Sequence, residues 1–177
     1  LPVFLYGHSM GGNVVINYAL RRKGRLKGVI ATSPFLKLAF EPPAWKLFFG
    51  KLIANVYPAL TMPNELNLDF ISKDQQEIEA YKNDPLIHDR VSPRYSIDFM
   101  KSGEWALENA ENLKLPMLLC HGQKDKITSA EASRRFAENA GNRVTFIPFP
   151  EGYHELHHDN ERQELFNIII DWIKKQI

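Results

Sequence analysis

Residues 1–12 read Leu-Pro-Val-Phe-Leu-Tyr-Gly-His-Ser-Met-Gly-Gly, so that Gly7, Ser9 and Gly11 form a G-x-S-x-G pattern. The apolar run at 3–6 before this pattern is typical of a buried strand, and apolar residues with helical spacing follow it. A serine on a sharp turn between strand and helix is held out of the sheet, where a base can reach its hydroxyl. We therefore predict that Ser9 is a nucleophile on a strained strand-to-helix turn.

The residues around this serine have predicted roles of their own. We expect side chains at Gly7 and Gly11 to collide with the neighbouring strand and helix, which would explain why both positions are glycine. A helix that begins near Met10 directs free backbone N–H groups at the place where negative charge develops on an attacked carbonyl. The Met10 N–H is therefore the candidate oxyanion donor.

Strands and helices alternate at both ends of the chain. Short apolar runs typical of strands lie at 28–31, 117–120 and 144–149, and helical patterns lie at 129–140 and 161–176. This order predicts an α/β fold with a mostly parallel sheet and helices on both of its faces.

The middle of the chain differs from its two ends. Residues 35–112 show only helical pieces interrupted by prolines, with an apolar stripe at helical spacing that includes Trp45, Phe48, Phe49 and Leu52. Connections this long rarely lack structure of their own. We predict a helical cap at 35–112, inserted into a core formed by residues 1–34 and 113–177.

Composition limits the classes of function. The 177 residues contain 22 Lys and Arg against 21 Asp and Glu, and this balance argues against nucleic acid as a partner. Apolar residues make up 44% and charged residues 24%, as in globular proteins. Cys120 is the only cysteine, which excludes an internal disulfide and a cysteine-based metal cluster. The apolar runs are too short to span a membrane. The single cysteine fits a reducing compartment, so we expect a cytoplasmic protein, with a peripheral location at membranes as the alternative.

A base and an acid for the serine follow later strands. Asp125 comes just after the run at 117–120, and His154 comes just after the run at 144–149. Both would lie at the carboxyl ends of parallel strands, where open α/β sheets bind ligands. We predict that His154 takes the proton of Ser9 and that Asp125 fixes the tautomer of His154. Two alternatives stay open: Asp125 as a turn residue, and His157 or His158 as the base.

A competing pattern overlaps the candidate base. Residues 154–158 read His-Glu-Leu-His-His and match H-E-x-x-H, in which two histidines on one helical turn bind zinc. That geometry needs a helix through His154 and His158. Because Pro148, Pro150 and Gly152 lie just upstream and the helix start signals come later, we predict that no metal is bound in this way.

Four segments together resemble the monoglyceride lipase and lysophospholipase group of the α/β-hydrolase superfamily, over essentially the whole chain. They are residues 1–12, Asn83-Asp84-Pro85-Leu86, His121-Gly122-x-x-Asp125 and Gly152-Tyr153-His154-x-Leu156-His157. The resemblance implies hydrolysis of carboxylic esters of single-chain acylglycerols, with Ser9, Asp125 and His154 as a catalytic triad and with no metal or organic cofactor. It also implies that family strands preceding this segment, and a second oxyanion donor, are absent from residues 1–177, so we expect the C-terminal part of a longer enzyme.

The resemblance extends to the substrate. His157 matches a position that contacts the glycerol head group in monoglyceride lipases, although it also fits an ordinary histidine beside a helix. We add His8, next to the nucleophile, to the substrate-binding candidates. Trp45, Phe48, Phe49 and Leu52 would line a channel for the acyl chain of a small lipid ester. The same apolar residues would equally suit transient docking on a membrane surface or packing of the cap on the sheet.

Rival functions remain at this point. A broad carboxylesterase or a peptidase of the same superfamily would use the same three side chains. A non-catalytic binding protein with this fold is the alternative from another class, because a fold does not by itself determine a function.

Overall fold

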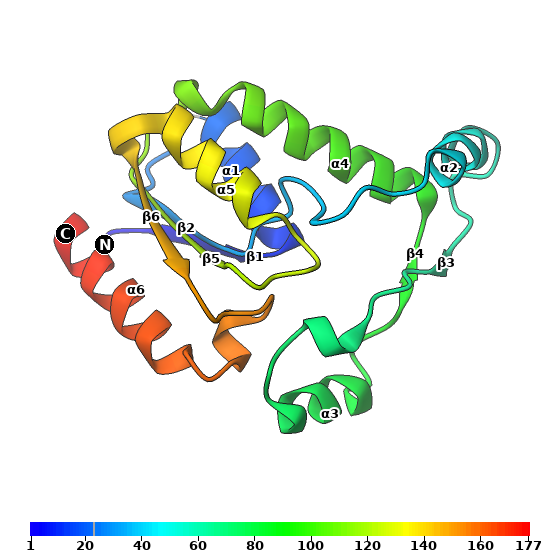
Figure 1. Cartoon of the computed structure of the whole chain (residues 1–177). Coiled ribbons are helices and arrows are strands. Elements are labelled where there is room, and N and C mark those ends of the chain that lie inside the picture. The colour runs from blue at the N-terminus through cyan, green and yellow to red at the C-terminus, as the bar shows by residue number, and fades with distance from the viewer. Residues whose placement is uncertain (23) are drawn as a thin grey trace.

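The structure is a computed structural model that describes residues 1–22 and 24–177. In this part of the chain, four parallel strands form a sheet in the order β1-β2-β5-β6 (Figure 1). They are β1 (Phe4–His8), β2 (Gly28–Thr32), β5 (Met117–Gly122) and β6 (Val144–Phe149). The predicted α/β fold with a mostly parallel sheet is confirmed.

Helices cover both faces of the sheet (Figure 1). The helices on one face are α1 (Met10–Arg21), α4 (Pro93–Glu108) and α5 (Ala130–Ala140), and α6 (Arg162–Gln176) lies on the other. Alternate residues of each strand point to opposite faces, so Ala31 packs under α1 and α5 while its neighbour Ile30 packs against Trp172 of α6. Two apolar cores result, and they hold the sheet rigidly between them.

The register of the sheet brings the strand ends together. His8 is paired with Thr32, Thr32 with Cys120, and Gly122 with Phe149. The loops after β1, β5 and β6 therefore leave the same edge of the sheet. Short 3₁₀ helices complete the core, namely η2 (Ala110–Asn112), η3 (Gly141–Arg143) and η4 (Leu156–His158).

The middle segment is largely helical and extends away from the sheet (Figure 1). Its elements are α2 (Ala44–Val56), β3 (Met62–Pro63), η1 (Leu68–Phe70), α3 (Gln75–Asn83) and β4 (Arg90–Val91). The sequence did not predict the short antiparallel ribbon that β3 and β4 form.

Helix α4 belongs to the 35–112 segment but takes part in the core. It contacts α1 and α5, and its Ile97 and Ala106 are buried. Gly103 lies so close to the start of the 35–112 segment that a side chain there would collide with the carbonyl of Leu36. The last part of the 35–112 segment therefore packs on the helical layer that covers the sheet. None of the helices in the described ranges has the length and apolar character needed to cross a membrane.

Candidate active site

Ser9 lies between β1 and α1 in a strained backbone conformation. Its φ is 52° and its ψ is −116°, a region that costs a non-glycine residue about 1–3 kcal/mol. The surrounding backbone holds it there: the Ser9 N–H donates to the Thr32 carbonyl at 3.0 Å, and the Ser9 carbonyl accepts from the N–H groups of Asn13 and Phe35. The predicted sharp turn at this serine is present.

The glycines of this turn differ from the prediction in one respect. A side chain at Gly7 would collide with the backbone of Gly11, as expected for a tight strand-to-helix turn. The prediction for Gly11 is wrong, because a Cβ atom there would have no neighbour within 4 Å. The close approach occurs one residue later, where a Cβ on Gly12 would lie 2.8 Å from the Cβ of Pro34.

The three predicted side chains of the triad meet at the edge of the sheet. His154 Nε2 lies 3.0 Å from Ser9 Oγ, and His154 Nδ1 lies 2.7 Å from Asp125 Oδ2. An ionised Asp125 accepts from Nδ1–H, which leaves Nε2 as the acceptor of the serine proton. Asp125 and His154 are both buried. Met10 is the first residue of α1, so its N–H is one of the helix amides without an intrahelical acceptor.

Asp125 is held as a carboxylate by several donors. Its Oδ1 accepts from the N–H groups of Ile127 and Thr128 at 2.7 and 2.9 Å, and its Oδ2 also accepts from the Thr128 hydroxyl at 2.8 Å. Burial by itself raises the pKa of this carboxyl, but hydrogen bonds from His121 and His154 outweigh burial and hold the pKa well below its ordinary value. Asp125 thus closes a turn with Ile127 and also contacts His154. It is therefore a turn residue and the partner of the candidate base at the same time.

His121 is a residue of this site that sequence reasoning missed. It is fully buried, its Nε2 lies 3.1 Å from Asp125 Oδ2, and its Nδ1 lies 2.7 Å from Ser133 Oγ. With Nε2–H donating to Asp125, Nδ1 accepts from the Ser133 hydroxyl. The sequence offered one signal, a histidine at the end of a buried strand four residues before the candidate acid.

The other histidines of the 154–158 run point elsewhere. Residues 156–158 form the 3₁₀ helix η4, and His158 Nδ1 lies 2.8 Å from Glu77 of α3. His154 contacts Asp125 and Ser9, so His154 and His158 do not share one face of an α-helix. The H-E-x-x-H zinc geometry is therefore not formed.

His8 and His157 are joined by Glu155, a second residue that sequence reasoning missed. Glu155 Oε1 lies 3.3 Å from His8 Nε2, and Glu155 Oε2 lies 2.9 Å from His157 Nε2. Burial alone raises the pKa of Glu155, but the close approach of His157 and His8 reverses the effect and lowers the pKa below its ordinary value. Burial also lowers the pKa of His8. The cluster therefore carries a carboxylate beside imidazoles, next to the nucleophile.

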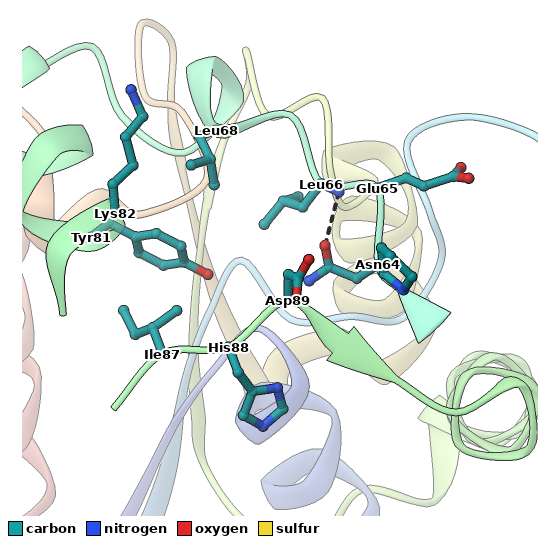
Figure 2. Close-up of a pocket in the computed structure, with 10 residues that line it drawn as sticks. Asn64, Glu65, Leu66, Leu68, Tyr81, Lys82, Ile87, His88 and Asp89 are labelled. Carbon is teal, nitrogen blue, oxygen red and sulfur yellow. Dashed lines mark hydrogen bonds between the residues drawn. The ribbon is translucent and has the colours of Figure 1, made fainter. Parts of the chain in front are cut away.

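A cavity of about 610 Å³ lies in the middle segment, between the β3–β4 ribbon, η1 and α3 (Figure 2). Leu66, Leu68 and Ile87 give it an apolar lining, and the Tyr81 hydroxyl points toward its interior (Figure 2). Burial, and to a lesser extent the charge of Glu155, raise the pKa of Tyr81, so this cavity lies within electrostatic reach of the histidine cluster.

The predicted channel residues lie outside this cavity. On α2, Trp45, Phe48, Phe49 and Leu52 are 61%, 66%, 52% and 53% exposed. Residues of the ribbon, of η1 and of α3 line the cavity. Helix α2 contacts α4 and buries its Ala54, while its aromatic residues are exposed.

Comparisons with known proteins agree with this fold. The family model described as serine aminopeptidase, S33 matches residues 1–161. An abhydrolase domain-containing protein of Dictyostelium discoideum is 33% identical over the whole chain, and a putative monoglyceride lipase of Schizosaccharomyces pombe is 30% identical over 98% of it. The crystal structure of Paleococcus ferrophilus monoacylglycerol lipase superimposes on 99% of the chain with a TM-score of 0.93 and 33% identity.

These proteins are longer than the present chain. The chain spans 19% of the Dictyostelium relative, 48% of the Schizosaccharomyces relative and 69% of the Paleococcus chain. The family match nevertheless includes the serine turn, the Asp125 loop and His154. The chain therefore belongs to the serine aminopeptidase S33 family of the α/β-hydrolase superfamily.

Proposed function

We propose that the protein hydrolyses carboxylic esters of single-chain acylglycerols, of the monoacylglycerol or lysophospholipid type. The observation that carries this proposal is the hydrogen-bonded series from Ser9 Oγ through His154 to Asp125. The Schizosaccharomyces and Paleococcus proteins, which are named as monoglyceride and monoacylglycerol lipases, support the substrate class.

In the proposed reaction, His154 Nε2 removes the Ser9 proton as Ser9 Oγ attacks the ester carbonyl. The resulting oxyanion accepts a hydrogen bond from the Met10 N–H, and the α1 dipole favours its negative charge. His154 then gives its proton to the departing alcohol, which leaves an acyl group on Ser9. Water activated by His154 attacks this acyl-enzyme and releases the fatty acid, and Asp125 stabilises the imidazolium in both halves.

The substrate is assigned to two regions. The cavity lined by Leu66, Leu68 and Ile87 suits an acyl chain, because each buried methylene contributes about 0.8 kcal/mol without any polar recognition. His8 and His157 lie beside the nucleophile and suit the hydroxyl groups of the glycerol head. The exposed apolar face of α2 suits contact with the lipid surface from which the substrate is taken.

The experiment labels the complete protein with a fluorophosphonate probe, which reacts with an activated serine. We expect labelling of the wild type and none of Ser9→Ala, with Ser33→Ala as the matched control that keeps it. Labelling that survives Ser9→Ala would refute the assignment of the nucleophile.

A substrate series separates the rival activities. Monoacylglycerols of increasing chain length are compared with p-nitrophenyl acetate and with aminoacyl p-nitroanilides, which a peptidase would cleave. We expect kcat/KM to rise with chain length, and Ile87→Trp to reduce it for long chains more than for short ones. A maximum at acetate would favour a broad esterase, and cleavage of the anilides alone would favour a peptidase.

A further inference from the structure

Beside the nucleophile, His8, Glu155 and His157 bring three ligand atoms within 4.8 Å of one another. His8 is the last residue of β1, Glu155 directly precedes η4, and His157 lies within η4. The reaction proposed above leaves Glu155 without a role. This carboxylate nevertheless lies between two imidazoles beside the nucleophile.

The orientation of His8 leaves one ring nitrogen facing a negative group. Its Nδ1 lies 3.1 Å from the Thr32 hydroxyl oxygen, which also lies 3.0 Å from the Tyr6 hydroxyl. With Nδ1–H donating to Thr32, Nε2 presents a lone pair to Glu155 Oε1 at 3.3 Å. In the described part of the chain, this buried Nε2 atom forms no hydrogen bond. The repulsion between this lone pair and the carboxylate oxygen is relieved by a cation between them, either a proton or a metal ion.

The geometry points to a binding site for a divalent cation of the zinc class, formed by His8 Nε2, the Glu155 carboxylate and His157 Nε2. We propose that a cation bound there inhibits the hydrolase. The inhibition rests on the proposed function, whereas the binding does not. This site differs from the H-E-x-x-H arrangement, because it uses Glu155 as a ligand and neither His154 nor His158.

The donor set and its spacing fit zinc. Two imidazoles and one carboxylate are a common zinc ligand set that leaves a fourth position open, whereas Ca²⁺ and Mg²⁺ prefer oxygen ligands. Zinc–ligand bonds of about 2.0–2.1 Å in a tetrahedron place two ligand atoms about 3.3 Å apart. His8 Nε2 lies 3.3 Å from Glu155 Oε1 and His157 Nε2 lies 2.9 Å from Glu155 Oε2, so each nitrogen is close to this spacing from one of the two carboxylate oxygens.

The hydrogen bond from His8 to Thr32 supports the same assignment. Histidines that bind metals usually donate their second ring N–H to a neighbouring acceptor, which fixes the tautomer and the ring orientation. Thr32 provides that acceptor here, and it is fully buried at the end of β2. His8 is thereby held with Nε2 directed at the cluster.

The position of the cluster explains why the cation would inhibit. The His8 and His154 rings are 4.9 Å apart between centroids. Proton transfer from Ser9 gives His154 a positive charge, and a dication nearby opposes this charge. The open fourth position would also be occupied where we place the head group of the substrate.

Direct binding tests the site. Zn²⁺ is titrated by calorimetry into the complete, chelator-treated protein, and Co²⁺ is added separately to record the visible absorption of a four-coordinate ion. We expect one equivalent to bind. Because loss of a mere orienting partner costs about 10–100-fold in metal affinity, we expect Glu155→Gln and His157→Gln to weaken binding by about 100-fold or more. The matched control His158→Gln, at the next residue, should keep the wild-type affinity.

Three results would overturn the site. They are absence of stoichiometric binding to the wild type, unchanged affinity in Glu155→Gln and His157→Gln, and loss of binding in His154→Gln with retention in Glu155→Gln. The last result would assign the ion to the triad histidine.

Inhibition is measured separately, as the ratio of the reaction rates with and without Zn²⁺. We expect Zn²⁺ to suppress fluorophosphonate labelling and ester hydrolysis of the wild type, and the same concentration to leave the residual rates of Glu155→Gln unchanged. If the protein hydrolyses esters but does not bind zinc, the metal site is refuted and the proposed function stands. Zinc binding at the cluster in a protein without hydrolase activity would refute the proposed function and leave the site standing.

Discussion

The Oγ atom of Ser9 lies 3.0 Å from the Nε2 atom of His154, although 145 positions separate the two residues in the chain. The sheet brings the two residues together, because β1 ends at His8, β6 ends at Phe149, and both are parallel strands of the same sheet. The contact therefore depends on correct assembly of the strands between them. Any variant that shifts the sheet should affect the site even where its side chain is remote.

Asp125→Asn tests the proposed acid. The neutral amide carries no charge to stabilise an imidazolium, and its NH2 group can donate to His154 Nδ1, which favours the unproductive tautomer of the ring. We expect kcat to fall by about 10⁴-fold with little change in KM, measured by steady-state ester hydrolysis. Asp98→Asn, in the exposed pair with Arg94, serves as the control. A loss of less than tenfold would restrict Asp125 to a structural role in its turn.

His121→Leu tests whether the second histidine positions Asp125. It removes the hydrogen bond by which His121 orients the carboxylate, so we expect His154 to be positioned less accurately and kcat to fall about tenfold or more. A carboxylate with one donor fewer attracts the His154 imidazolium more strongly, so the acid limb of the kcat/KM profile should move to higher pH. His121→Gln, whose amide can still donate to Asp125, should shift the acid limb less. An unchanged pH profile would leave His121 as a packing residue only.

Paired substitutions at the serine turn test the glycine geometry. Gly11 lies inside α1 with open space around it, so Gly11→Ala should raise the free energy of unfolding by about 0.5–1 kcal/mol. Gly12→Ala should lower it by about 1–3 kcal/mol, because the added methyl group meets Pro34. Urea unfolding of the two variants measures both effects. Equal destabilisation would show that Gly11 is also confined.

The half-buried Glu155 should make stability depend on pH in the acid range. Because its pKa is lower in the folded than in the unfolded chain, its contribution is full above the ordinary value of about 4.3 and is lost as pH falls further. The difference in unfolding free energy between wild type and Glu155→Gln should therefore shrink below about pH 4. Urea unfolding between pH 3 and 6, with a chelator present, measures it. A constant difference over this range would contradict an ionised Glu155.

Local patterns in the sequence predicted much of the core. The strand before Ser9, the helix after it and the Ser129 cap, whose hydroxyl accepts from the Ala132 N–H, depend on neighbouring residues and are therefore readable from the sequence. The order of serine, acid and histidine was readable too, since each follows a strand. The β3–β4 ribbon was not, because two-residue strands carry no periodicity.

By itself, the sequence determined a parallel α/β sheet and the residues at its strand ends, because alternation of apolar runs and turn residues acts over short distances. The tertiary structure alone decided that His121 joins Asp125 and that Glu155 joins His8 and His157. It also decided that α2 turns its aromatic face outward while other residues line the cavity. These contacts depend on how segments that are distant in the sequence pack together. The burial and the charge environment of each side chain are therefore determined by residues outside its local sequence pattern.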